Sequence, residues 1–155
     1  MKNYLIKVLF LVIPSLAFAA TDFNRLTDAV AIAESNNDSQ AVGDGGKARG
    51  AYQMWLIAWQ QTSVERRREG KQVYHFAYAH DAFVSREYAK SYLEWCARVM
   101  EKRLGRPATP WEIYACYARG IGNFEDINYR YTELPVRTKK AIGKIYTALQ
   151  LPLPK

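Results

Sequence analysis

Glu34 is a carboxyl group on the apolar side of a predicted helix. Phe23, Leu26 and Val30 precede it at helical spacing, so that Glu34 lies on the same face as the predicted core. Burial and the negative end of the helix dipole both raise the pKa of a carboxyl group. An acid that keeps its proton near neutral pH can donate that proton to a leaving-group oxygen. The position therefore predicts a general acid, while a solvated glutamate at a helix end is the simpler interpretation.

A glycine-rich loop follows Glu34 and leads into an aromatic ring and an amide. The loop spans residues 43–50, contains four glycines, and is followed by Tyr52 and Gln53. Glycine lets the backbone approach a ligand closely or take a positive φ. Aromatic rings bind the faces of sugars, and amides bind sugar hydroxyl and N-acetyl groups. The combination indicates a carbohydrate site, with an ordinary surface turn as the alternative.

Apolar residues recur at helical spacing along most of the chain after residue 20. One helix start is marked by Thr109, Pro110 and Glu112, which form a capping box with proline at the first helical position. Residues 73–79 are ambiguous and are expected to form a loop with short helical turns, and no segment is typical of a β-strand. Helices are predicted over approximately residues 23–34, 54–67, 83–104, 110–119 and 137–149. The fold class is therefore mainly α, with a single domain of about five or six helices.

The first 19 residues have the pattern of a cleaved secretory signal. Lys2 supplies a positive start, residues 4–18 are mostly apolar, and Ala17 and Ala19 are small residues at the positions that a signal peptidase reads. The apolar run is shorter than the roughly 20 residues that span a bilayer, so a retained anchor is the minority interpretation. We expect export to the periplasm or beyond, with residues 20–155 as the mature domain and no transmembrane segment after cleavage.

The chain is basic, with 22 Lys and Arg against 15 Asp and Glu and a net charge of +7. A basic exported protein is drawn to anionic surfaces such as cell-wall polymer, lipopolysaccharide, nucleic acid or membrane. Trp55, Trp59 and the arginine run at 66–68 are compatible with a protein that disturbs membranes or binds nucleic acid. Because cations at a helix end also suit the helix dipole, the run is interpreted as a solvated helix end. No nucleic-acid partner is expected.

Two cysteines, Cys96 and Cys116, lie at similar distances on either side of a predicted turn at residues 105–107. An antiparallel helical hairpin would bring them level, and a cysteine pair in an oxidising compartment usually forms a disulfide. We therefore predict a Cys96–Cys116 bridge. The cysteines are not closely spaced and the chain has only two histidines, so the sequence indicates neither a metal site nor a cofactor.

Several motifs, in order along the chain, resemble those of lytic transglycosylases and goose-type lysozymes. The family pattern begins with Glu-Ser, continues with Ala-Val and ends its first part in Gly-[Leu/Ala]-[Met/Tyr]-Gln. Residues 34–35, 41–42 and 50–53 correspond to these three parts. Residues 116–123, Cys-Tyr-Ala-Arg-Gly-Ile-Gly-Asn, are similar to the family's later Ala-Tyr-Asn-Ala-Gly-x-Gly-Asn.

The resemblance extends over nearly the whole mature chain, with several departures. Asp81 and the pair at 92–93 are similar to the family's middle helix, and residues 134–135 to the approach to its final helix. The departures concern the sugar subsites more than the acid. They are Ala118 and Arg119 in place of Asn-Ala, Ser85 and Ala89 in place of Asn and Gly, and Tyr52 in place of the commoner Met.

The resemblance implies a lysozyme-like fold and cleavage of the β-1,4 bond after N-acetylmuramic acid in peptidoglycan. It makes Glu34 the general acid and base, and it places Ser35, Tyr52 and Gln53 in the sugar groove. Tyr117 would lie close to Glu34 and orient its carboxyl group, unless it is simply a core tyrosine. Peptidoglycan glycan strands are the expected partner. Because the second motif is altered, a non-catalytic wall-binding protein of the same fold stays open as an alternative.

The same acid supports two reactions. A hydrolytic glycosidase normally needs a second carboxylate, which activates water or acts as the nucleophile. A lytic transglycosylase needs none, because the C6 hydroxyl of the muramic sugar attacks C1 while Glu34 acts first as acid and then as base. Asp44 is the candidate second carboxylate, since its spacing before Gly50 resembles an acidic loop residue of goose-type lysozymes; Asp38 is a weaker one. An Asp-Gly turn is the alternative for Asp44, and we favour the transglycosylase over the hydrolytic lysozyme.

Overall fold

The computed structural model describes residues 21–154, and this part of the protein is mainly helical. Its helices are α1 (Phe23–Ser35), α2 (Leu56–Arg68), α3 (Ala82–Leu104), α4 (Pro110–Arg119), α5 (Ile121–Glu125) and α6 (Val136–Leu149). The predicted fold class, a mainly α domain of five or six helices, is confirmed. The predicted secretory signal at residues 1–19 lies outside the described residues.

Local sequence signals explain where several helices begin. Asp22 accepts hydrogen bonds from backbone N–H groups in the first turn of α1, and Asp81 does the same for α3. Before α4, the Glu112 carboxylate accepts a hydrogen bond of 2.8 Å from the backbone N–H of Thr109. This is the reciprocal half of the predicted capping box, and it fixes the start of α4 at Pro110.

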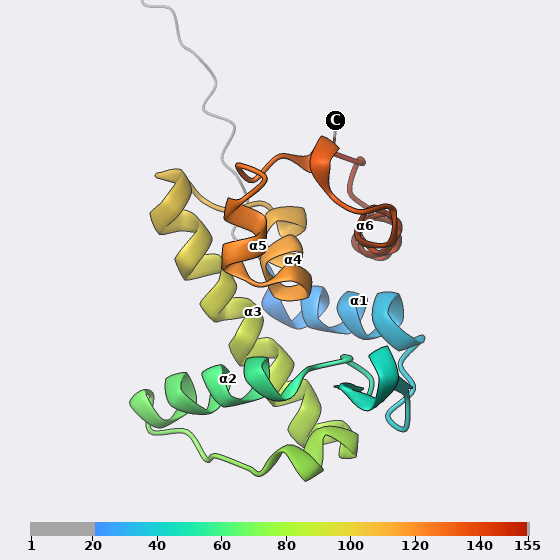
Figure 1. Ribbon diagram of the computed structural model, residues 1–155, viewed down its shortest axis with the longest axis vertical. Coiled ribbons are helices and arrows are strands. Elements are labelled where there is room, and N and C mark those ends of the chain that lie inside the picture. Colours follow the sequence, from blue (N-terminus) through green and yellow to red (C-terminus); the bar gives the residue numbers. More distant parts are fainter. Residues whose placement is uncertain (1–20, 155) are drawn as a thin grey trace, which may run out of the picture.

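The longest helix, α3, runs diagonally through the molecule beside α1, α2 and α4, and α6 lies farther from it (Figure 1). α1, α2 and α4 all contact α3, and α6 packs on α1. On the α2 side, Trp59 stacks on Tyr88 of α3 with ring centroids 3.7 Å apart. The largest fully buried side chains are Trp59, Tyr88, Phe124, Leu26, Leu93 and Met100. One continuous core therefore holds the C-terminal end of α1 in a fixed position against α4 and α6.

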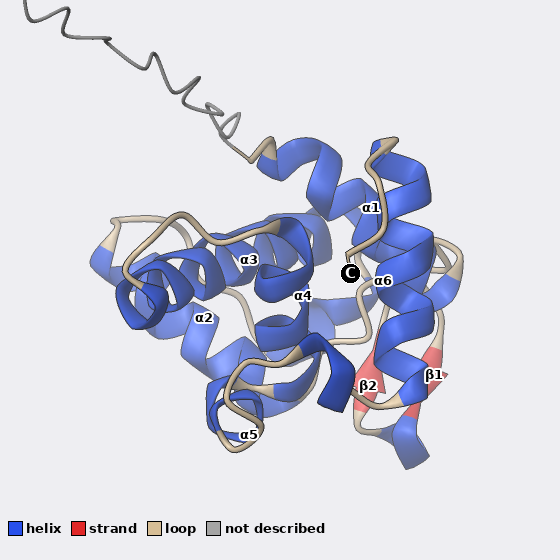
Figure 2. Cartoon of the chain, turned by 90° about the horizontal axis from the view of Figure 1, so that it is seen from above, coloured by secondary structure: helices blue, strands red, loops and turns tan. Residues whose placement is uncertain are grey.

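Two short strands form a hairpin where the sequence predicts none. β1 (Val42–Gly43) pairs antiparallel with β2 (Ala48–Arg49), and a 3₁₀ turn at Asp44–Gly46 joins them. A further bridge pairs Arg49 with Met54, so the chain doubles back before α2. The hairpin and α6 lie on the same side of the molecule (Figure 2). Strands of two residues carry no alternation that a sequence can reveal.

The remaining differences from the predicted elements are small. α5 forms where the sequence predicts only that α4 stops, because Gly120 at φ +75° redirects the chain and helix resumes at Ile121. α2 begins at Leu56 rather than Met54. The ambiguous segment contains a 3₁₀ helix, Phe76–His80, in agreement with the predicted short helical turns.

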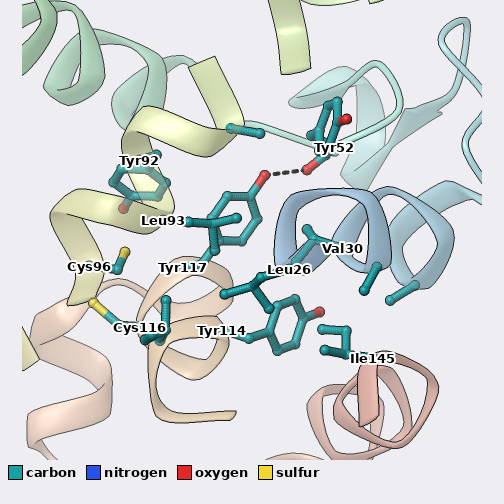
Figure 3. Packing of buried hydrophobic residues seen from close by; sticks show 14 of the residues in the cluster. Leu26, Val30, Tyr52, Tyr92, Leu93, Cys96, Tyr114, Cys116, Tyr117 and Ile145 are labelled. Carbon is teal, nitrogen blue, oxygen red and sulfur yellow. Dashed lines mark hydrogen bonds between the residues drawn. The ribbon is translucent and has the colours of Figure 1, made fainter. Parts of the chain in front are cut away.

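Cys96 of α3 and Cys116 of α4 are buried and face each other where the two helices meet (Figure 3). Their side chains are close enough to hydrogen-bond, and burial raises the pKa of the Cys96 thiol. The predicted proximity is therefore confirmed, but the predicted disulfide is not formed, since both cysteines are free. A free thiol behaves as a small apolar side chain, which suits this contact.

Two findings bear on the membrane and nucleic-acid interpretation. No helix within residues 21–154 is both long enough and apolar enough to cross a bilayer. The arginine run at the end of α2 is not a simple solvated helix end, because Arg66 is buried and donates to two backbone carbonyls and to the Ser91 hydroxyl. Arg68 pairs with Glu65 at 2.7 Å. The run therefore does not present three exposed charges together.

Candidate active site

A cleft of about 610 Å³ opens beside the C-terminal end of α1. The hairpin turn, the start of α2, the C-terminal part of α4, α5 and the start of α6 form its other walls. This volume lies in the range of ordinary ligand sites, about 300–1,000 Å³. The charged and aromatic groups on its walls include Glu34, Asp44, Trp55, Tyr114, Arg119 and Arg137.

Glu34 lies in the last turn of α1, and its half-buried side chain lines the cleft. The helix ends directly after it, because Asn36 takes the left-handed conformation at φ +57°. Burial raises the pKa of Glu34 above its ordinary value of 4.5, although the hydrogen bond from Tyr114 and the charge of Arg137 act in the opposite direction. Glu34 therefore keeps its proton to higher pH than an exposed glutamate does, as its position in the sequence predicts.

The tyrosine that contacts Glu34 is Tyr114 and not Tyr117. The Tyr114 hydroxyl donates to Glu34 Oε1 at 2.7 Å. The Tyr117 hydroxyl donates instead to the backbone carbonyl of Tyr52, also at 2.7 Å (Figure 3). The expectation that Tyr117 orients Glu34 is therefore wrong. Both tyrosines lie on one face of α4, and the packing of α4 against α1 brings the earlier one to the acid.

Asp44 stands in the same cleft with both carboxylate oxygens occupied. Arg137 donates to Asp44 Oδ1 at 3.0 Å, and the Trp55 indole N–H donates to Oδ2 at 3.2 Å. The hydrogen bond from Arg137 is the main reason that the pKa of Asp44 is lowered. The pKa of Asp44 therefore lies below that of Glu34. The weaker candidate, Asp38, is not among the cleft residues, and its carboxylate accepts from the backbone N–H of Gln40 at 2.8 Å.

Two residues predicted to bind sugar lie outside the cleft. The Ser35 hydroxyl donates to the backbone carbonyl of Ala51 at 2.9 Å and accepts from the N–H of Asp38 at 3.0 Å. It therefore ties the end of α1 to the loop rather than facing a ligand. Tyr52 is buried in the core, and this burial raises its pKa to about 12. Its backbone carbonyl, rather than its ring, supports the cleft through Tyr117.

Gln53 lines the cleft, as predicted. Its backbone is left-handed, with φ +47°, and its side-chain N–H donates to the Gly50 carbonyl at 3.0 Å. One half of the amide thus closes the turn before α2. Its Oε1 lies close to Gly43, where an added Cβ would overlap it. The predicted amide is present in the cleft, but it also fixes the hairpin.

The exposed aromatic side chain among the cleft residues is Trp55, which the sequence suggested for a different class of function. Trp55 is 41% exposed, and the Lys47 ammonium lies 5.4 Å from the centre of its ring. Its hydrogen bond to Asp44 orients the indole at the cleft wall. The available signal was its place two residues after Gln53, directly beyond the predicted sugar-binding motif. Nothing in the sequence pointed to Arg137, which lies on α6, far along the chain.

The cleft therefore combines one carboxyl group whose pKa is raised with another whose pKa is lowered. Titratable groups whose surroundings push their pKa values apart are typical of sites that use one group as acid and another as base or charge stabiliser. Within residues 21–154, no group of three or more His, Cys, Asp or Glu side chains is placed to hold a metal ion. No protein-family model, curated protein or solved structure matches this chain. Its function is therefore inferred from the residues of this cleft.

If Glu34 acts as an acid, Tyr114→Phe should shift its titration. The Tyr114 hydroxyl donates to the Glu34 carboxylate and lowers its pKa, so its removal raises that pKa further. The alkaline limb of the pH profile of kcat/KM should move to higher pH, and kcat should fall about 10-fold as the acid loses its orientation.

The matched control is Tyr117→Phe, which removes the neighbouring hydroxyl from a backbone carbonyl instead. We expect this variant to lose stability, because the buried Tyr52 carbonyl then has no donor, and to keep the alkaline limb in place. Equal shifts of the limb in the two variants would contradict the assigned role of Tyr114.

Proposed function

We propose that this protein cleaves the β-1,4 glycosidic bond after N-acetylmuramic acid in peptidoglycan, with Glu34 as the general acid. One observation carries the proposal: a half-buried carboxyl group with a raised pKa, held by a tyrosine hydroxyl at the wall of an open cleft. Such a group can protonate the glycosidic oxygen as the bond to C1 breaks. The motif resemblance at residues 34–53 and 116–123 supplies the substrate class.

The walls of the cleft support a sugar substrate. Trp55 offers an exposed ring surface, and Ile57 beside it is 71% exposed. Polar groups suited to sugar hydroxyl and N-acetyl groups come from Gln53 and Asn123, which lie on the hairpin side and on α5. A mostly apolar wall with a few placed polar groups is the usual composition of a ligand site.

The favoured reaction is that of a lytic transglycosylase. Glu34 gives its proton to O4 as the C1–O4 bond breaks, and the C6 hydroxyl oxygen of the same muramic sugar bonds to C1. The proton of that hydroxyl then returns to the Glu34 carboxylate, so no water is consumed. Asp44, although paired with Arg137, keeps part of its negative charge at the cleft wall, where it can partly stabilise the positive charge that develops at C1. Its lowered pKa and its bonds to Arg137 and Trp55 make it a weak base, which disfavours activation of water.

A hydrolytic lysozyme is the second candidate, because Asp44 lines the same cleft as Glu34. In that reaction a water oxygen bonds to C1 in place of the C6 hydroxyl, with Asp44 accepting its proton or stabilising the intermediate. The requirement for Glu34 is the same in both reactions. The products differ, because hydrolysis leaves a reducing end.

Two other classes of function are alternatives to an enzyme. A non-catalytic wall-binding protein would use the cleft without the proton chemistry, and it would not need a carboxyl group held by Tyr114 at the cleft wall. A membrane-disturbing or nucleic-acid-binding protein would use exposed arginines, yet Arg66 is committed to internal hydrogen bonds. Both observations favour the enzyme.

Mass spectrometry of digested peptidoglycan should distinguish the reactions. We expect the purified protein to release muropeptides that end in a 1,6-anhydro sugar, one water lighter than lysozyme products. Asp44→Asn should preserve these products, since no base is needed to activate water, and should slow their formation roughly 10-fold or more through the lost charge. Release of only reducing-end products, abolished in Asp44→Asn, would establish the hydrolytic alternative. No release at all would refute both.

A further inference from the structure

Arg119 is a cleft residue whose guanidinium is only partly used by the protein. It lies at the last position of α4 and lines the same cleft as Glu34. One of its terminal N–H groups donates to the backbone carbonyl of Asn123 at 3.3 Å. Its Nε is buried and has no hydrogen-bond partner among residues 21–154. Since buried donors are nearly always paired, this unpaired donor shows that the described residues do not fully satisfy the Arg119 guanidinium.

Arg119 and Asn123 are joined by two hydrogen bonds, one to the backbone of Arg119 and one from its side chain. The Asn123 side-chain amide donates to the Arg119 backbone carbonyl at 2.8 Å, so the two residues bond reciprocally across the turn at Gly120. The first contact holds the backbone turn between the two residues, and the second restricts the guanidinium before any ligand arrives. A pre-organised arginine loses less entropy on binding than a free one.

The charges in the cleft leave Arg119 without a counter-ion. Arg137 is paired with Asp44 at 3.0 Å, so these two charges offset each other. Glu34 accepts a hydrogen bond from Tyr114 and forms no ion pair among residues 21–154. Within residues 21–154, Arg119 makes no ion pair with a carboxylate. Of the two arginines that line the cleft, Arg119 is therefore the one without an ion-pair partner among the described residues, which favours an anionic substrate.

We infer that Arg119 binds a carboxylate group of the glycan substrate and so sets the enzyme's preference for acid-bearing over neutral glycans. The inference rests on the proposed function, because it assigns the substrate of the same cleft. The planar guanidinium of an arginine matches the two oxygens of a carboxylate. Neutral N-acetylglucosamine strands carry no such group, whereas muramic sugars and their stem peptides do.

In peptidoglycan the carboxylate has two possible sources. A muramic sugar without its peptide exposes a lactyl carboxylate, while intact peptidoglycan carries carboxylates only along the stem peptide. The binding assay therefore uses three probes: N-acetylglucosamine oligomers, amidase-stripped glycan strands and intact muropeptide strands. Affinity is measured by calorimetry in the Glu34→Gln background, so that the strands are bound but not cleaved.

The variant is Arg119→Gln, which keeps much of the side chain and removes the charge. Its control is Arg67→Gln, which removes one positive charge from an exposed position on α2 outside the cleft. We expect Arg119→Gln to weaken binding of the acid-bearing strands about 10-fold or more, as for loss of a charged hydrogen bond. Binding of the neutral oligomers should be unchanged, and Arg67→Gln should match the parent for every probe. Whichever acid-bearing probe loses affinity identifies the source of the carboxylate.

Equal losses for neutral and acidic probes, or no loss for either, would overturn the inference. So would equal affinity of the parent for all three probes. The proposed function is tested by a different result. It is refuted if the wild-type protein releases no muropeptides, even when binding of acid-bearing strands still depends on Arg119. Charge-dependent binding without cleavage would thus leave Arg119 as the ligand residue of a binding protein.

Discussion

Glu34→Gln should lower the rate of peptidoglycan cleavage by roughly 10²–10⁴-fold, the contribution typical of a general acid. Glutamine fills the same space and can accept the hydrogen bond that Tyr114 gives to Glu34 Oε1, but it has no proton to donate. The loss should therefore appear in kcat, with binding of glycan strands retained. Release of muropeptides, followed by liquid chromatography and mass spectrometry, measures the rate.

The control for this variant is Glu101→Gln, which makes the same chemical change at an exposed position of α3 outside the cleft. It should release muropeptides at the wild-type rate. If Glu34→Gln retained more than about a tenth of the wild-type rate, Glu34 would not be the proton donor.

The same variant should also change how stability depends on pH. A folded-state pKa above the unfolded value of 4.5 means that the native protein binds the Glu34 proton more tightly than the unfolded chain does. The stability that this proton contributes is fully present below pH 4.5 and is lost as pH rises through the folded-state pKa. Glutamine does not titrate, so Glu34→Gln should gain stability relative to wild type as pH rises through that window. Thermal unfolding between pH 4 and 8 tests the sign.

The features that the sequence predicted correctly depend on short-range chemistry. The capping box at Thr109 and Glu112 and the helical spacing that ends at Glu34 involve residues within one or two turns of each other. Such signals act in any fold. The presence of these helices, and the position of Glu34 on the apolar face of its helix, could therefore be predicted from the sequence alone. The start of α5 depends on Gly120, which takes a positive φ between α4 and α5. In the sequence, a glycine at this place indicates equally well that the helix simply ends.

The features that the sequence reasoning missed depend on how separate elements meet. Tyr114 and Tyr117 are equally placed on one face of α4, and only its packing against α1 decides which one reaches Glu34. Arg137 reaches Asp44 across the cleft from α6, which no local pattern encodes. Tyr52 is buried in the core, since the chain turns back at Gly50. Trp55, and not Tyr52, therefore lines the cleft.

Gly50→Ala should be the most destabilising single substitution in the hairpin. Gly50 is buried with φ +71°, and an added Cβ would overlap the backbone carbonyl oxygen of Ala79 and lie 3.0 Å from its carbon. Backbone atoms of Ala79 cannot rotate away as a flexible side chain can. The strained φ and the overlap together should cost about 3 kcal/mol or more of the free energy of unfolding. Thermal unfolding should show a melting temperature lower by about 10 °C.

The matched control is Gly45→Ala in the turn of the same hairpin. Gly45 also has a positive φ of +65°, but an added Cβ there meets nothing within 4 Å. It should therefore show only the backbone strain, about 1 kcal/mol, with little change in the cleft. Gly50, by contrast, accepts hydrogen bonds from both the backbone and the side chain of Gln53, so its displacement moves the cleft wall and lowers glycan affinity as well. If Gly50→Ala and Gly45→Ala lowered the free energy of unfolding equally, the close approach of Gly50 to the Ala79 backbone would not be the cause of the expected destabilisation.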